Sequence, residues 1–219
     1  MRNFFTRAQD PVSSETHAIG AGLALLGAFV FLLRANLDGA PTGALAAAMC
    51  FSLSMIALYS ASAIYHFYPG NAQSAGVKRF LRKMDHSMIY VLIAGSYTPF
   101  SMVLLPQPKG AQFCLALWGV AIAGVLAKLL WINAPRVLST VIYLVMGWAI
   151  VFVAGDFAAV SLPCVGLIAL GGVSYSVGAV FYALKKPNIS SRWTFHELFH
   201  LFILGGSFFH YLAVFCYVL

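Results

Sequence analysis

Residues 111–131 read AQFCLALWGVAIAGVLAKLLW, a stretch of mostly apolar residues with a single charge at Lys128. A helix rises 1.5 Å per residue, so about 20 such residues cross a hydrocarbon core of about 30 Å. Lys128 lies near the end of the stretch, so we expect its side chain to reach the membrane interface. This stretch therefore predicts a transmembrane helix.

The rest of the chain repeats this pattern. Of its 219 residues, 61% are hydrophobic and 9% are charged, whereas about 25% are charged in an ordinary soluble domain. So few charges cannot cover a water-facing surface, and no linker or internal repeat divides the chain. The sequence predicts an all-α membrane protein, a seven-transmembrane helix bundle in one domain over residues 1–219. The predicted spans lie near 18–34, 43–67, 85–105, 111–131, 137–155, 158–184 and 196–218.

Positive charge is unevenly distributed over the connectors between these spans. When alternate connectors are assigned to opposite sides, only Arg34 and Lys109 fall on one side. Short connectors rich in Lys and Arg stay in the cytoplasm, so we predict a cytoplasmic N-terminus and an outside C-terminus. The cations of the cytoplasmic side are Arg2, Arg7, Lys78, Arg79, Arg82, Lys83, Lys128, Arg136, Lys185, Lys186 and Arg192.

The formal net charge of +7 does not indicate a nucleic-acid partner, because these cations lie in short connectors and not on one face of a soluble surface. The connector from Pro69 to Met84 interleaves cations with Val77 and Phe80 at helical spacing. Two interpretations stay open: an amphipathic segment on anionic lipid headgroups, or simply a loop that sets the topology. Membrane lipids are the expected partners.

Four ionisable residues lie at one predicted depth. His66 ends the second span, Asp85 opens the third, and His196 with His200 opens the seventh. In the predicted orientation all four lie at the cytoplasmic end of the bundle. Ionisable groups inside a membrane are costly, so each is a candidate functional residue.

The pair His196 and His200 are i, i+4 neighbours, so one helix can offer two imidazoles to one ion. Imidazole suits zinc, with copper, nickel or iron as weaker candidates, and three protein ligands plus a water are the arrangement of catalytic zinc sites. The alternative is that each histidine is an interfacial side chain bonded to the backbone. The shared depth favours a metal, and we predict zinc bound by His66, His196 and His200.

Asp85 and Ser62 are the candidate catalytic residues. Asp85 is a metal ligand, a group that contacts the water at the metal, or a helix cap. We favour the second role, because a carboxylate placed there acts as a general base. Ser62 lies one turn from His66 on the same helix face, and either orients a carbonyl group or bonds only to its own helix backbone.

Four other polar residues are left out of the predicted metal ligands. His17 lies at the same end and is a candidate to support the site from outside. His86 points about 100° away from its predecessor around the helix. His210 lies about 15 Å farther along its helix than the histidine pair, too far to bind the same ion. Glu197 projects from another face of that helix, and we assign it no chemistry.

Over nearly the whole chain, these motifs together resemble bacterial hemolysin III-type members of the progestin and adipoQ receptor family, which are related to the adiponectin receptors and alkaline ceramidases. Each motif alone is weak, whereas the combination is specific. The residues that carry the resemblance are Thr16 to Gly20, Ser62, His66, Asp85, Gly95 to Phe100, His196, His200 and Gly205 to Ser207.

The resemblance implies a multi-pass protein of the bacterial inner (plasma) membrane with a role in lipid homeostasis. It also implies zinc on the three histidines, with Asp85 near the water and Ser62 beside it. The function that follows is zinc-dependent hydrolysis of a lipid amide or ester, as in a ceramidase. Two alternatives stay open: a non-enzymatic membrane sensor or regulator with structural zinc, and, least favoured, a pore-forming hemolysin, for which no span shows a sustained polar stripe.

Overall fold

The structure is a computed structural model that describes residues 8–71 and 74–219. Within these ranges, seven helices are long and apolar enough to cross a membrane, which confirms the predicted all-α, seven-helix architecture. They are α1 (Pro11–Asp38), α2 (Thr42–Phe67), α3 (Ala75–Pro99) continued by the π-helix η3 (Phe100–Leu104), α4 (Lys109–Leu130), α5 (Arg136–Gly147) continued by the 3-10 helix η4 (Ala149–Ala159), α6 (Leu162–Leu184) and α7 (Phe195–Tyr217).

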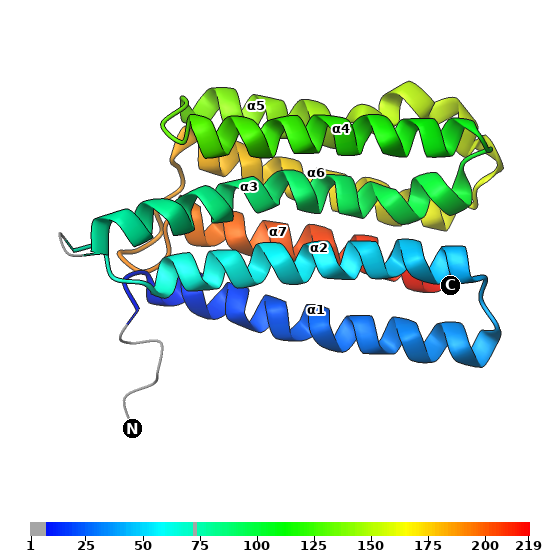
Figure 1. Ribbon diagram of the computed structural model, residues 1–219, viewed down its shortest axis with the longest axis horizontal. Coiled ribbons are helices and arrows are strands. Elements are labelled where there is room, and N and C mark those ends of the chain that lie inside the picture. The colour runs from blue at the N-terminus through cyan, green and yellow to red at the C-terminus, as the bar shows by residue number, and fades with distance from the viewer. Residues whose placement is uncertain (1–7, 72–73) are drawn as a thin grey trace.

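The helices lie side by side along one direction (Figure 1). The pairs α1–α2, α2–α3, α3–α4 and α6–α7 pack against each other, and α7 also contacts α1. Between α1, α2 and α7, the side chains of Phe31, Phe51, Tyr59 and Val214 are fully buried and form part of one apolar core. This packing brings the end of α2 next to the beginning of α7.

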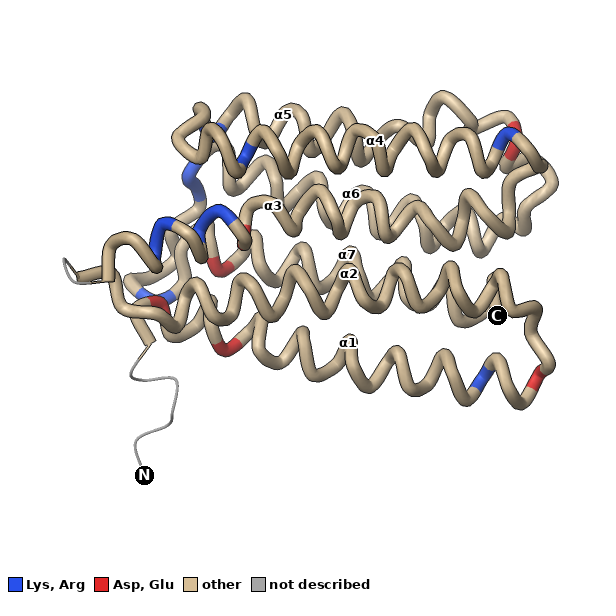
Figure 2. Tube along the Cα trace, in the orientation of Figure 1, with Lys and Arg blue, Asp and Glu red and all other residues tan. Residues whose placement is uncertain are grey.

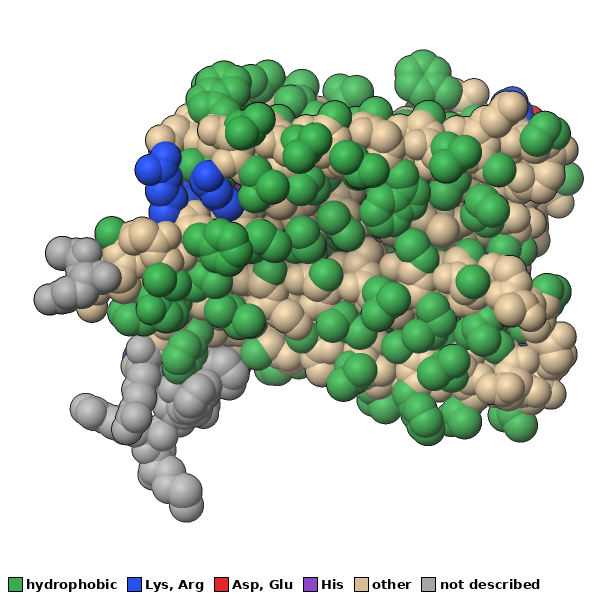
Figure 3. Space-filling view, viewed as in Figure 1, with side chains coloured by type: hydrophobic (Ala, Val, Ile, Leu, Met, Phe, Trp, Pro, Cys, Tyr) green, Lys and Arg blue, Asp and Glu red, His purple; other side chains and the backbone are tan. Residues whose placement is uncertain are grey.

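The outer surface of the bundle is apolar, as contact with lipid requires. Figure 3 shows hydrophobic side chains distributed over the visible face of the helices. Leu23, Leu115 and Phe152 are among the large apolar side chains that are exposed. Without a bilayer this surface would lie in water, so the exposed side chains agree with the membrane assignment made from composition.

Gly95 allows α3 to approach α2 closely. A Cβ atom at this position would lie 2.2 Å from Oγ of Ser54 on α2, closer than any real contact. Small residues let membrane helices pack backbone to backbone, and glycine is the smallest. The contact holds α3, which carries Asp85, against α2, which carries Ser62 and His66.

The third helix begins earlier than predicted. α3 starts at Ala75, so most of the connector expected from Pro69 to Met84 is the first part of the membrane-spanning helix. Val77 and Phe80 are exposed on this part, and the ammonium of Lys78 donates a hydrogen bond to the carbonyl of Tyr68, 2.7 Å away. From Ala75 onward the segment is therefore helical, as the amphipathic interpretation requires, and its role in setting the topology stays a prediction.

The fifth span is not one regular α-helix. α5 ends at Gly147, and the chain continues as the 3-10 helix η4. The hydroxyl of Tyr97 on α3 donates to the carbonyl of Gly147 at 2.5 Å and accepts from the amide of Ile150 at 3.1 Å. A membrane interior supplies no water to backbone groups that lose their helical partners, so this side chain satisfies two of them.

The charged residues lie towards the two ends of the bundle, and most of the cations lie at one of them (Figure 2). At one end Arg34 lies 2.8 Å from Asp38, and Lys109 forms an ion pair with Asp156. We call the other end the basic end, and the orientation in which it faces the cytoplasm stays a prediction. It carries Lys78, Arg79, Arg82, Lys83, Lys128, Arg136, Lys185, Lys186 and Arg192, whereas Arg2 and Arg7, which were predicted for this side, lie outside the described residues.

Candidate metal site

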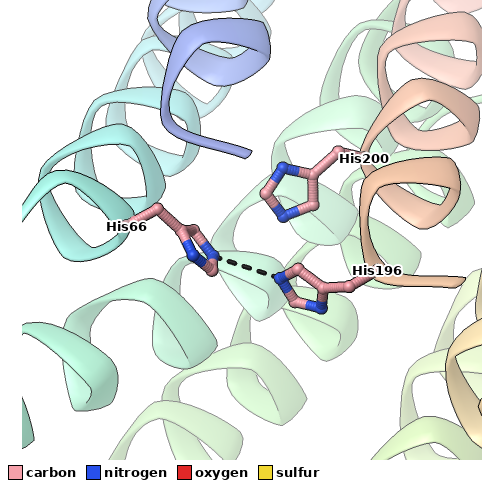
Figure 4. Close-up of side chains that lie close together, drawn as sticks. All are labelled: His66, His196 and His200. Carbon is pink, nitrogen blue, oxygen red and sulfur yellow. Dashed lines mark hydrogen bonds between the residues drawn. The ribbon is translucent and has the colours of Figure 1, made fainter. Parts of the chain in front are cut away.

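Three histidines converge at the basic end (Figure 4). His66 lies in the last turn of α2, and His196 and His200 lie in the first two turns of α7. Each offers one ring nitrogen, and these three atoms lie within 4.8 Å of one another. His66 and His200 are buried and His196 is half-buried. The structure thus brings together the three residues that were predicted as metal ligands from distant parts of the sequence.

The start of α7 is held by a capping box. The amide of Thr194 donates to Oε2 of Glu197 at 2.9 Å, and the Thr194 hydroxyl accepts from the amide of His196 at 3.3 Å. The other carboxylate oxygen of Glu197 accepts a hydrogen bond of 2.9 Å from the hydroxyl of Ser13 on α1. These bonds satisfy amides at the helix terminus and fix where His196 leaves the backbone. Glu197 therefore has a structural role, and the sequence assigned it no chemistry.

Asp10, which sequence analysis missed, holds the ring of His66. Its Oδ2 lies 3.0 Å from Nδ1 of His66, and its amide donates to the carbonyl of His66, also at 3.0 Å. The hydrogen bond from His66 lowers the pKa of the Asp10 carboxyl and outweighs the effect of partial burial. The signal that points to Asp10 is an acidic residue just before the first span, on the same predicted side as the histidines.

The tautomer of His66 follows from this contact. An ionised carboxylate only accepts hydrogen bonds, so Nδ1 carries a proton, and the tautomer of a neutral ring held in this way has its lone pair at Nε2. Nε2 of His66 lies 3.1 Å from Nε2 of His196. A carboxylate that orients a histidine in this way is the usual support for a metal-binding imidazole.

His17 lies directly against the site. Its ring stacks on that of His200, with centroids 3.6 Å apart and planes 8° from parallel. Both ring nitrogens of His17, and Nδ1 of His200, are buried and have no hydrogen-bond partner among the described residues. The ring of His17 thus contacts His200 by its face, and supports the site from outside the three-histidine group.

Asp85 and Ser62 line the wall of a cavity that also reaches His196 and His200. The cavity has a volume of about 400 Å³ and is lined mainly by apolar side chains of α3, α5, α6 and α7. The hydroxyl of Ser62 is buried without a hydrogen-bond partner among the described residues. Asp85 is buried but is not part of the group of close ligand atoms. The structure therefore places both candidate catalytic residues on the wall of the cavity that His196 and His200 also line, and Asp85 is not one of the close ligand atoms.

The remaining histidines, His86 and His210, lie outside the group of three, as predicted. His86 was expected to point away from Asp85, but the two side chains are in contact. Nδ1 of His86 lies 2.8 Å from the carbonyl of Arg82 and 3.6 Å from Oδ2 of Asp85. His210 is buried farther along α7, and its Nε2 lies 3.1 Å from the carbonyl of Ile168. Neither belongs to the group of three close histidines.

Lys128 corrects an expectation from the sequence. Its side chain was expected to reach the membrane interface, but the residue is only 5% exposed. Its ammonium instead donates a hydrogen bond to the hydroxyl of Ser139 on α5. A lysine near the end of a span does not have to point outward when the bundle interior offers a hydrogen-bond acceptor, and Lys128 lines the same cavity as Asp85.

These features define a class: a multi-pass membrane protein with a buried three-histidine centre at one end. The sequence profile described as "Haemolysin-III related" matches residues 5–211. The chain is 35% identical over 204 residues to the "Hemolysin-3 homolog" of Bacillus subtilis (strain 168), covering 93% of this chain and 91% of that one. It is 33% identical over 212 residues to "Hemolysin-3" of Bacillus cereus, covering 96% and 92%.

A more distant similarity extends to the animal proteins. The "Adiponectin receptor protein" of Drosophila melanogaster is 27% identical over 172 residues, which cover 67% of this chain and 37% of that protein. The chain belongs to the haemolysin III-related family, as a hemolysin III-type bacterial membrane protein among the progestin and adipoQ receptors.

Proposed function

We propose that this protein is a zinc-dependent hydrolase of a lipid amide or ester, with a role in membrane lipid homeostasis. The observation that carries the proposal is the buried group of three ring nitrogens within 4.8 Å of one another, adjoining a largely apolar cavity that Asp85 also lines. A metal centre next to an acyl-sized apolar space suits a substrate that enters from the bilayer. The sequence motifs, which resemble a family related to the alkaline ceramidases, point the same way.

The donor set fits zinc. Zinc is commonly bound by neutral imidazoles at about 2.0–2.1 Å, and two such nitrogens on one tetrahedral ion lie about 3.3 Å apart. The Nε2 atoms of His66 and His196 are 3.1 Å apart, and Nδ1 of His66 is occupied by Asp10. A direct hydrogen bond between the two rings also explains that separation, but it leaves the convergence of His200 unexplained.

Zinc bound by the three imidazoles would supply a Lewis acid that polarises the scissile carbonyl and makes water more acidic. Asp85 accepts a proton from water as the general base, because it is the one carboxylate on the described cavity wall. The free hydroxyl of Ser62 donates a hydrogen bond that orients the carbonyl oxygen. The apolar wall holds the acyl chain, and the burial of the site limits access of bulk water.

Under this proposal the basic end faces the cytoplasm, and the protein resides in the bacterial inner membrane. Connectors that carry many Lys and Arg residues stay inside, and the cations of the opposite end are both paired with acids. The substrate then meets the site near the cytoplasmic leaflet. The names of the Bacillus relatives refer to haemolysis. Of the candidate functions of this protein, a pore-forming hemolysin is the least favoured.

A second candidate function is a non-enzymatic membrane sensor with structural zinc. The contact of Asp10 with His66 joins the start of α1 to the end of α2, and the contact of His66 with His196 joins α2 to α7. A metal at this point would therefore clamp three helices. Such a clamp would respond to the lipid state of the membrane without chemistry.

The test is a comparison of membrane lipids from cells with the protein, without it, and with His196→Ala. The control is Asp38→Ala, which removes an ionisable side chain that is paired with Arg34 at the opposite end of the bundle. The hydrolase predicts a lipid change that requires His196 and not Asp38. Identical lipid profiles in all four strains would contradict the hydrolase and favour the sensor.

A further inference from the structure

Three cations line the cavity near the three-histidine site. Arg82 lies on α3, Lys128 on α4 and Arg136 on α5, and the side chains of all three reach the cavity wall. They are all the Lys and Arg residues of the described cavity lining. Figure 3 shows Lys and Arg side chains gathered at this end of the molecule, over α3 and α4.

Hydrogen bonds link the three helices that carry these cations. The ammonium of Lys83 on α3 donates to the carbonyl of Leu129 on α4, and that of Lys128 on α4 donates to Ser139 on α5. The hydroxyl of Tyr143 on α5 donates to the carbonyl of His86 on α3, 3.1 Å away. The helices that carry the cations are thus linked in a closed ring of contacts at this depth.

The cavity carries an excess of positive charge. Among the described residues, none of the three cations forms an ion pair with an acid. Asp85 is the only acid among the described residues of the lining, and its ion contact is with His86, at 3.6 Å. Three cations against one carboxylate leave two positive charges without a counter-charge on this described lining.

Membrane topology accounts for only part of this arrangement. Arg82 is exposed. Arg136 is partly exposed and lies over the ring of Tyr182, 4.6 Å from its centroid. The charges of both are therefore explained by their effect on the orientation of the bundle in the membrane. Lys128 is 5% exposed, and among the described residues its ammonium has one hydrogen bond, to a neutral hydroxyl. A charged ammonium buried without an anion is costly, so a negatively charged ligand would stabilise it in this position.

We propose that Arg82, Lys128 and Arg136 bind the phosphate of an anionic lipid whose acyl chain lies in the apolar part of the cavity. The inference rests on the proposed function, for which it names the substrate class. A phosphate monoester carries a charge of about −1.5 to −2 at pH 7, which matches the excess on the wall. Arginine binds phosphate with two parallel hydrogen bonds, and lysine adds a point charge.

The test is the binding of oleoyl lysophosphatidate to purified protein in a neutral detergent, followed as the shift of the thermal unfolding midpoint during titration. Monooleoylglycerol has the same chain without the phosphate, and inorganic phosphate has no chain. We expect lysophosphatidate to bind at least about 10-fold more tightly than either, the order of one charge-assisted hydrogen bond. Lys128→Met should remove this advantage, and Lys185→Met, at an exposed cation outside the cavity, should keep it.

Two further variants keep the test valid if Lys128→Met does not fold. Arg82→Gln changes an exposed side chain and should weaken lysophosphatidate binding about 10-fold, whereas Lys128→Arg should bind as the wild type does. Equal affinity for lysophosphatidate and monooleoylglycerol would overturn the inference. Tighter binding of oleate than of lysophosphatidate would mean that the cations bind a carboxylate. Binding of inorganic phosphate as tight as that of lysophosphatidate would mean that they bind a free ion. Either result would overturn the inference.

The outcomes separate this inference from the hydrolase proposal, because the binding assay needs no turnover. Selective binding of lysophosphatidate with no hydrolysis of any lipid would support the anionic headgroup site and contradict the hydrolase. Hydrolysis of a neutral lipid at the same rate by the wild type and by Lys128→Met would support the hydrolase and overturn the headgroup site.

Discussion

Asp10 and His66 are joined twice, through a side-chain contact of 3.0 Å between Oδ2 and Nδ1 and through a backbone hydrogen bond of 3.0 Å. The two contacts tie the segment before α1 to the end of α2 and fix the plane of the imidazole ring. The ring nitrogen Nε2 is then directed at His196. A preorganised imidazole binds a metal without first losing rotational freedom, so under the proposed function Asp10 would contribute to the affinity for zinc without touching the ion.

Asp10→Ala should therefore weaken zinc binding by about 10- to 100-fold, the usual effect of removing a carboxylate that orients a metal-binding histidine. The measurement is competition for zinc against a chelator of known affinity. Asp38→Ala is the control, because Asp38 is paired with Arg34 at the opposite end. Wild-type zinc affinity in Asp10→Ala would mean that the contact with His66 does not support a metal site.

Asp85→Asn and His200→Ala should separate the base from the ligand. Three imidazoles hold zinc without Asp85, but an amide cannot accept the proton that a carboxylate takes from water. Asp85→Asn should keep the zinc and lose hydrolysis, and His200→Ala should lose both. The measurements are zinc content and release of the acyl chain. If Asp85→Asn emptied the site at saturating zinc, Asp85 would be a ligand, and the structural-zinc sensor would be favoured.

Much of the fold could be predicted from the sequence because a bilayer constrains it strongly. Apolar runs of span length can only be helices there, which gave seven spans in their correct order. The shared depth of His66, His196 and His200 followed from counting spans. The break between α5 and η4 could not be predicted in this way, because it depends on the hydroxyl of Tyr97, which belongs to another helix.

The surroundings of the site were harder to predict, because they depend on where side chains point. Asp10 lies before the first apolar run, where an acid needs no explanation, and only folding brings it to His66. The burial of Lys128 could not be predicted for the same reason, since the sequence shows the depth of the residue in the membrane but not the direction of its side chain. Depth in a membrane can thus be read from the chain, whereas rotation around a helix axis depends on packing against neighbours.

Thr194→Ala should lower stability by about 1 kcal/mol, the usual cost of a lost helix N-cap. It removes the hydroxyl that accepts from the amide of His196 and so loosens the turn that carries this ligand. Ser161→Ala is the matched control, because Ser161 precedes α6 without a side-chain capping bond. The measurement is thermal unfolding in detergent. Equal midpoints for the two variants would show that the capping box does not stabilise α7.

Reporter fusions should reveal the orientation of the bundle. Alkaline phosphatase fused after Leu219 should be active, because we predict that the C-terminus lies outside, whereas the same enzyme inserted in the Pro69 to Met84 segment should be inactive. The basis is the excess of cations at the basic end. Activity only in the segment from Pro69 to Met84 would reverse the orientation and place the three histidines at the outer face.

The central claim is that His66, His196 and His200 hold one zinc ion, and the most direct measurement is elemental analysis of protein purified without chelators. We predict one zinc per chain in the wild type and in His86→Ala, and little or none in His200→Ala, because His86 lies outside the group of close ring nitrogens. Wild-type protein free of metal, or His200→Ala with a full complement of zinc, would contradict the site.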